Sequence, residues 1–288
     1  MVALAEQIKR PMPCAEANQG WKAELNLGFK RKLEHTVLSR HAQFGPLTVQ
    51  RPFYPEKETC HLYLLHPPGG VVGGDELRIN VRLEEEARVL LTTPGATKFY
   101  RSMGALAQQV QTLSVADGCA LEWLPQENIF FDQTRSHLST RIVLEDTARF
   151  IGWEINCYGR PASRDLFTKG LVRTRLEVIR DGVPLLLDQL LVEDASALKS
   201  PGSFNGYSCF GTLVATQVSP RLLDLVRTIV STRENRQLVG LSLLDDLLVA
   251  RCLGHYSESI ANTLRSIWAA LRPELLEREA CHPRIWST

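Results

Sequence analysis

Lys22-Ala-Glu-Leu-Asn-Leu-Gly-Phe29 and Glu76-Leu-Arg-Ile-Asn-Val-Arg-Leu83 are the two stretches that decide the fold class. In each of them an apolar residue occupies every second position. Successive side chains of a β-strand point to opposite faces of its sheet, so this alternation predicts two strands that are buried on one face only.

Six shorter apolar runs are bounded by Gly, Pro, Asn or Asp, the residues that favour turns. They are His61–Leu65, Val89–Thr93, Leu121–Leu124, Phe150–Cys157, Val172–Ile179 and Leu185–Val192. Short strands at this density predict a mainly β fold.

Two α-helices are predicted towards the C-terminus, at 220–231 and 259–272. Ser219 suits an N-cap and Pro220 the first helical position of the first helix. Apolar residues from Ile260 to Leu271 recur at helical spacing in the second, and Pro273 stands where that helix should end. The segment 243–253 fits either a helix or a strand.

The chain shows no repeat of fixed period and no linker that would mark a domain boundary. We therefore expect a single domain over 21–288. The first 20 residues contain Pro11 and Pro13 and lack periodicity, so they predict a loosely held tail.

Charge and hydropathy exclude several classes of protein. Lys and Arg number 33 and Asp and Glu 32, and the formal net charge of +1 lacks the electrostatic footprint of a general nucleic-acid binder. No stretch has the roughly 18 consecutive apolar residues of a membrane span, and Met1–Arg10 has no secretory apolar core. We expect a cytoplasmic protein that binds neither nucleic acid nor membrane.

Seven cysteines are scattered singly along the chain, and none forms a C-x-x-C pair. This usage fits reduced thiols and argues against a structural zinc site. His61 and His66 flank one predicted strand and face opposite sides of it by parity, so they cannot readily share a metal.

The segment His66-Pro-Pro-Gly-Gly-Val-Val-Gly-Gly-Asp75 has the glycine spacing of a phosphate-binding loop. The positions that should hold Lys and Ser or Thr are Asp75 and Glu76, whose carboxylates would repel a phosphate. The plainer interpretation is a tight crossover between two strands, although four glycines would also permit close backbone approach by another group.

Other catalytic motifs are absent from the sequence. Gly206-Tyr-Ser-Cys-Phe-Gly211 lacks the spacing of a nucleophile elbow, and no H-E-x-x-H or deaminase zinc motif occurs. We therefore assign no catalytic residue, and the sequence gives no support for hydrolase chemistry.

A Pro-Gly turn within Thr92–Ser102 carries Lys98, Tyr100 and Arg101. Tyr and Arg are enriched in protein interfaces, so these three residues are candidates for partner binding. The alternative is an ordinary exposed turn.

Several blocks of the sequence, in this order, resemble the UreD family of urease accessory proteins, also called UreH. The blocks are His66–Asp75, Thr93–Ser102, Leu121–Gln126, Gly159–Pro161 and Pro283–Trp286. The resemblance extends from about Trp21 to the C-terminus.

The resemblance implies a strand-rich fold with layered, partly helical winding of the sheet and two α-helices. It also implies a scaffold that is not an enzyme, with three partners: apo-urease, the accessory protein UreF and the GTPase UreG. Together these would insert nickel and carbon dioxide into urease in a GTP-dependent step. Nickel would be handled transiently, and no tightly bound cofactor is expected.

The family resemblance further implies an internal nickel passage, for which carboxylates are better suited than thiolates because they release a late divalent metal more readily. Asp75, Glu154 and Glu177 are the candidates, since a buried carboxylate is costly unless it is paired or metal-bound. Glu177 could instead pair with Arg173 or Arg175 on an exposed face.

Two other functions are open from the residues alone. A β-helix carbohydrate-active enzyme would need two carboxylates about 5 to 9.5 Å apart in a cleft. A polyanion-binding protein rich in Arg would show strongly salt-dependent affinity, and the near-neutral net charge argues against it.

Overall fold

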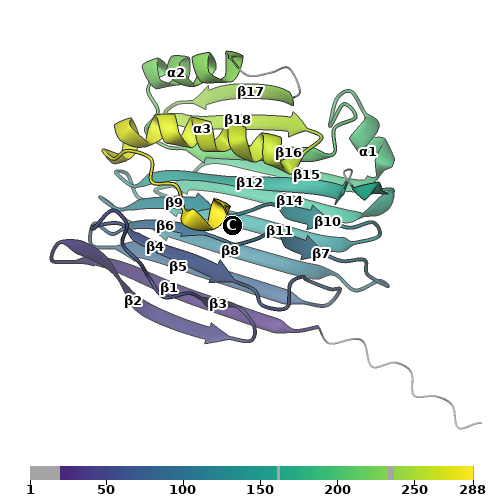
Figure 1. Ribbon diagram of the computed structural model, residues 1–288, viewed down its shortest axis with the longest axis horizontal. Helices are drawn as coiled ribbons and strands as arrows, with labels where there is room; N and C mark the ends of the chain where they lie inside the picture. Colours follow the sequence, from purple (N-terminus) through teal and green to yellow (C-terminus); the bar gives the residue numbers. More distant parts are fainter. Residues whose placement is uncertain (1–19, 161–162, 233–236, 288) are drawn as a thin grey trace, which may run out of the picture.

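The computed structural model of the protein describes residues 20–160, 163–232 and 237–287. Apart from Gly20, the tail expected at 1–20 lies outside the described residues. Within them the chain is mainly β, with strands in two large sheets and helices in its last third (Figure 1).

One sheet has seven strands among the residues that the structure describes. They are β1 Lys22–Lys32, β2 His35–Phe44, β5 Glu76–Glu84, β8 Ala107–Val115, β11 Arg135–Leu144, β14 Lys169–Arg180 and β15 Val183–Asp194. Their order is β15-β14-β11-β8-β5-β1-β2.

The other sheet has eleven strands in the described residues. They are β3 Thr48–Val49, β4 Cys60–Leu65, β6 Arg88–Thr92, β7 Thr97–Phe99, β9 Ala120–Leu124, β10 Asn128–Phe130, β12 Arg149–Arg160, β13 Asp165–Leu166, β16 Cys209–Ala215, β17 Gln237–Leu244 and β18 Leu247–Gly254. The main path is β17-β18-β16-β12-β9-β6-β4-β3, with β10 and β13 paired to β12 and β7 paired to β10.

The middle of the chain winds helically between the two sheets. From β4 to β14 the long strands alternate between the sheets, so that β5, β8, β11 and β14 are parallel neighbours in one and β4, β6, β9 and β12 in the other. Each turn of the winding adds one strand to each sheet. The predicted strand-rich, helically wound fold is confirmed.

Alternation along the strands sets which side chains enter the core between the sheets. Leu77, Ile79, Val81 and Leu83 of β5 are buried, as are the matching residues of β1, and the intervening polar residues face outward. All six shorter predicted runs coincide with strands. The two stretches that decided the fold class are parallel neighbours, in register from Lys22 opposite Glu76 onward.

Helices α2 Pro220–Ser231 and α3 Ser257–Leu276 form a second apolar core with the outer face of the eleven-stranded sheet (Figure 1). Helix α2 has the predicted bounds, and the hydroxyl of Ser219 caps it by accepting from the N–H of Leu222 at 3.3 Å. A short helix α1, Ala195–Lys199, and a 3-10 turn at Arg284–Ser287 were not predicted.

The prediction that a helix ends at Pro273 is wrong. Helix α3 continues to Leu276, and Glu277 ends it with a left-handed φ of 59°. A proline inside a helix removes one backbone hydrogen bond. The burial of Leu275 and Leu276 in the last turn offsets that loss.

The segment 243–253, which fitted either a helix or a strand, contains the end of β17, a turn and most of β18. Strands β17 and β18 pair antiparallel and meet at Asp245 and Asp246, where Asp245 has a φ of 53°. Within the part of the chain described, no helix is both long and apolar enough to cross a membrane.

Arg272, which is fully buried, holds α3 to the sheet through an ionic network. Its guanidinium donates to both carboxylate oxygens of Glu122 on β9, at 2.9 and 3.0 Å, and to both oxygens of Glu56, at 2.5 and 2.7 Å. The indole N–H of Trp268 donates to Glu122 at 2.6 Å. Burial would raise the pKa of Glu56, but the hydrogen bonds from His61 and Arg272 dominate and lower it to about 2.

Candidate functional site

A cavity of about 320 Å³ lies between the two sheets. Inward-facing side chains of β5 and β8 line one wall, and Trp123 and Glu154 of the eleven-stranded sheet line another. The cavity reaches the surface beneath two loops, where the exposed residues Gly69, Pro94 and Gly95 line it.

Glu154 is the carboxylate inside this cavity. It projects from β12, and its Oε1 contacts the hydroxyl of Thr140 on β11. That hydroxyl also lies 3.0 Å from the amide oxygen of Gln111, so its single proton can serve only one of the two acceptors at a time. Burial raises the pKa of Glu154 to about 7, with a smaller contribution from the charge of Asp188, and the Thr140 contact opposes the shift.

The His66–Asp75 loop forms part of the cavity mouth. It connects β4 to β5 and thus crosses from one sheet to the other, as the crossover interpretation predicted. A Cβ atom on Gly70 would lie 2.2 Å from the ring of Tyr100, so the close approach that this glycine permits is to the neighbouring loop.

Asp75 closes this loop. It is 7% exposed, and its two carboxylate oxygens accept from the backbone N–H groups of Trp21 at 2.8 Å and Val72 at 2.9 Å. Asp75 does not line the cavity that holds Glu154. In the structure its carboxylate is used to hold the loop.

Glu177 lies on the face of β14 opposite to that of Leu176 and Val178, which enter the core between the sheets. Its carboxylate contacts Arg175 and lies 3.8 Å from Arg141 on β11. Pairing with a neighbouring arginine, the alternative considered from the sequence, is therefore observed. Of the three predicted acids, Glu154 alone lines the cavity.

The three candidates for partner binding are placed differently. Lys98 lies on β7 and lines the cavity. Tyr100 is 37% exposed and packs on Phe131, with ring centroids 5.0 Å apart. Arg101 is exposed beside Met103, which is 99% exposed. Tyr100 and Arg101 are therefore available at the surface, and the ring of Tyr100 lies beside Gly70, which lines the cavity.

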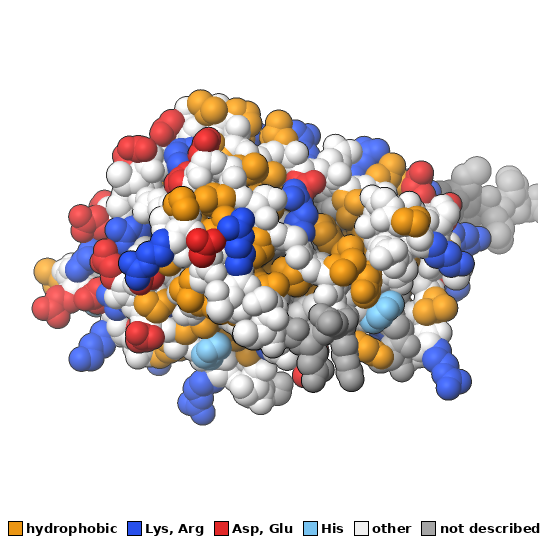
Figure 2. All heavy atoms as spheres, turned by 90° about the horizontal axis from the view of Figure 1, so that it is seen from above, with side chains coloured by type: hydrophobic (Ala, Val, Ile, Leu, Met, Phe, Trp, Pro, Cys, Tyr) orange, Lys and Arg blue, Asp and Glu red, His pale blue; other side chains and the backbone are white. Residues whose placement is uncertain are grey.

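Two partly exposed leucines lie on the edge strand β17 and on helix α2, which contacts it. Leu225 is 42% exposed and Leu238 is 49% exposed. Figure 2 shows hydrophobic side chains distributed among charged ones on the face seen from above. An edge strand with apolar side chains is a candidate for contact with another protein.

Sequence reasoning missed the polar lining of the cavity. Gln109 and Gln111 of β8 occupy inward positions, in step with Ala107 and Leu113, and both are 7% exposed. Polar residues at inward positions of an alternating strand are a signal that could have found them.

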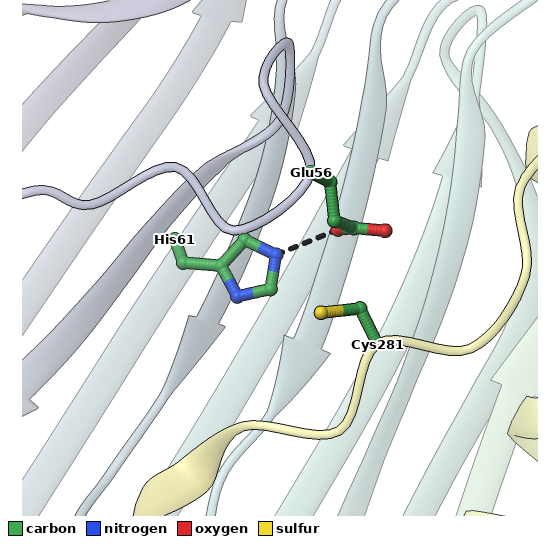
Figure 3. Close-up of side chains that lie close together, drawn as sticks. All are labelled: Glu56, His61 and Cys281. Carbon is green, nitrogen blue, oxygen red and sulfur yellow. Dashed lines mark hydrogen bonds and ion pairs between the residues drawn. The ribbon is translucent and has the colours of Figure 1, made fainter.

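Sequence reasoning also missed a cluster formed by Glu56, His61 and Cys281 (Figure 3). The ring Nε2 of His61 lies 2.7 Å from Oε2 of Glu56, and one potential ligand atom from each residue lies within 4.8 Å of the others. Residues 220 positions apart in sequence give no local signal for such a cluster.

Comparison with known proteins decides the family. The family model described as UreD urease accessory protein matches residues 22–287. The chain belongs to the UreD family. It is similar to urease accessory protein UreD of Alcanivorax borkumensis, 44% identical over 98% of this chain and 99% of the relative.

Other UreD proteins are similar over nearly their whole lengths. Those of Citrobacter koseri and Aliivibrio fischeri are 43% and 41% identical, each over 94% of this chain and over 93% and 98% of the relatives. UreD membership indicates a role in urease maturation. Three of the blocks on which the resemblance rested, those beginning at His66, Thr93 and Leu121, supply residues that line the cavity.

Proposed function

We propose that this UreD-family chain is a non-enzymatic scaffold in the cytoplasm that binds apo-urease and, with UreF and the GTPase UreG, supports GTP-dependent nickel insertion into urease. The observation that carries the proposal is the cavity between the sheets, which leads from surface loops to a buried carboxylate, Glu154. Co-purification of the full chain with urease subunits and UreF tests the scaffold role.

Nickel would pass through this chain as cargo. Glu154 and the side-chain oxygens of Gln109 and Gln111 offer hard, dispersed ligands, which bind a late divalent metal less firmly than thiolates would. The raised pKa of Glu154 weakens metal binding further, because a proton competes with the metal for the carboxylate near neutral pH. Weak and reversible binding is what transfer to another protein requires.

Charge reversal at Arg101 is expected to weaken the assembly with urease or UreF. Arg101 is exposed, and an introduced carboxylate would repel an acidic partner group and cost about tenfold or more in affinity. The measurement is recovery of urease and UreF on tagged Arg101→Glu. Arg40→Glu, on the exposed edge strand β2, is the matched control. Full recovery with Arg101→Glu would remove this residue from the interface.

The purified chain is expected neither to bind nor to hydrolyse GTP. A phosphate cradle needs free backbone N–H groups. Those of the glycine-rich loop donate within the protein at Gly69, Val71, Val72, Gly74 and Asp75. Calorimetry with GTP and Mg²⁺ should give no heat of binding, and UreG in the same buffer is the positive control. Saturable binding to this chain alone would contradict the assignment of the nucleotide step to UreG.

The two rival functions make different predictions. In the described part of the chain, Glu154 is the one carboxylate that lines the cavity, whereas glycoside hydrolysis needs a pair. Turnover of a polysaccharide would support the enzyme. Affinity for a polyanion that falls steeply with salt would support the polyanion binder.

A further inference from the structure

We propose that Glu56, His61 and Cys281 form a binding site for a borderline-soft divalent cation such as Zn²⁺ or Ni²⁺. The three residues come from the loop before β4, from β4 itself and from the segment that follows α3 (Figure 3). None of them lines the cavity that contains Glu154. The site is therefore separate from the proposed nickel route and does not depend on it.

The position of His61 shows that the proposed metal site and the cavity lie on opposite faces of β4. On β4, the side chains of Cys60, Leu62 and Leu64 enter the core between the sheets. By strand alternation His61 points to the opposite face, which the C-terminal segment covers. The ring nitrogen Nε2 is directed at Glu56, and the histidine is 0% exposed.

The donor set selects the kind of metal. Imidazole nitrogen, carboxylate oxygen and thiolate sulfur together favour zinc, nickel or cobalt over magnesium or calcium, which prefer oxygen ligands alone. Metal–ligand distances of about 2.0 to 2.3 Å place tetrahedral ligands roughly 3.5 Å apart. The donor atoms already lie within 4.8 Å of one another. A contraction of about 1 Å by side-chain rotation would complete three positions, and water would fill a fourth.

Arg272 is the obvious competitor for Glu56, because its guanidinium contacts both oxygens of that carboxylate. Arg272 has a second bidentate partner in Glu122, however, so it stays neutralised when Glu56 turns to a metal. Glu56 and a Cys281 thiolate then balance the two charges of the cation, and His61 adds a neutral ligand. The cation is then neutralised by its two negative ligands and Arg272 by Glu122, so no buried ion is left unpaired.

Bound metal would join β4 to the C-terminal segment. That segment already packs by its aromatic residues: the indole N–H of Trp286 donates to Thr92 at 3.0 Å, and its ring contacts Trp153 and Trp268. Because the metal would bind the folded chain and not the unfolded one, saturating Zn²⁺ should raise the midpoint of thermal unfolding.

The test uses the full chain with Zn²⁺ in calorimetry and Co²⁺ as a spectroscopic probe. The wild-type chain should bind Zn²⁺ stoichiometrically, and Co²⁺ should give a sulfur-to-cobalt charge-transfer band. Cys281→Ser should lose the band and weaken Zn²⁺ binding by about 10-fold to 100-fold or more. Cys119→Ser, at a buried thiol outside the cluster, should change neither.

A second measurement needs no variant and so does not depend on the folding of Cys281→Ser. Zn²⁺ should protect Cys281 of the wild-type chain from alkylation, as read by peptide mass spectrometry. Absence of stoichiometric Zn²⁺ binding, an unchanged cobalt band in Cys281→Ser, or alkylation of Cys281 at the same rate with and without Zn²⁺ would each overturn the proposal.

Discussion

Arg272→Met should lower the free energy of unfolding by about 3 to 5 kcal/mol, the usual cost of removing one partner from a buried ion pair. Methionine fills much of the same volume but leaves the carboxylates of Glu122 and Glu56 without their cation. Glu122 is 2% exposed, so water cannot readily replace the guanidinium. Urea unfolding followed by tryptophan fluorescence at neutral pH measures the loss.

The matched control is Arg227→Met on α2. Arg227 pairs with Asp224 at 2.8 Å, but both side chains are more than half exposed. An exposed pair of this kind contributes little, so the control should change stability by less than about 0.5 kcal/mol. Glu122→Gln added to Arg272→Met should recover part of the loss, because it removes one of the stranded charges. Equal effects of the two arginine variants would show that burial does not govern this network.

Local patterns in the sequence located eight strands (β1, β4, β5, β6, β9, β12, β14 and β15) and the helices α2 and α3. They missed other strands, among them β2, β8 and β11, and they did not show how the strands pair. Alternation located β1 and β5, since burial of one face imposes a period of two on each strand. Their parallel pairing joins residues 54 positions apart, such as Lys22 and Glu76, and no local pattern encodes it. The predicted helix end at Pro273 was wrong because the burial of the last helical turn depends on the tertiary packing of α3, which the local sequence does not show.

In the candidate site, too, local patterns predicted some features and only the fold determined the others. Parity within a strand establishes that Glu177 and Val178 face opposite ways, but it does not say which of those faces is the core between the sheets. Glu154 was a candidate because it lies within the predicted strand Phe150–Cys157, where a buried carboxylate is costly unless it is paired or metal-bound. Clusters such as Glu56 with Cys281, or Glu122 with Arg272, join segments that only the fold brings together.

Glu154→Gln is expected to lower the nickel content and activity of urease matured with this chain, by about tenfold or more, while the urease, UreD, UreF and UreG assembly forms normally. The amide keeps the shape and most contacts of the side chain but removes the one negative charge that lines the cavity in the described residues. Gln109 and Gln111 are neutral and cannot restore that charge. Nickel per urease active site, measured by metal analysis beside activity and complex yield, gives the result.

Folding should survive this substitution, because the folded chain favours the neutral form of Glu154. The folded-state pKa of about 7 lies above the ordinary value of 4.5, so the folded state binds more protons between these values and stability falls as pH rises through this window. Glu154→Gln should abolish that dependence and gain about 2 kcal/mol at pH 8, after allowing for solvent in the cavity. Asp75→Ala is less informative, since Asp75 also holds its loop.

Glu177→Gln is the comparison that decides where the route lies. Its carboxylate was also a candidate from the sequence, yet it contacts Arg175 and Arg141 on the face of β14 turned away from the core between the sheets. If nickel moves through the cavity, Glu177→Gln should leave urease loading unchanged while Glu154→Gln reduces it. Normal loading with Glu154→Gln would make that acid structural, and loss of the assembly would make it a folding or interface residue. Glu177 does not line the cavity that Glu154 lines. If both variants lost nickel equally in intact assemblies, the loss would not depend on the cavity, and the route would lie elsewhere.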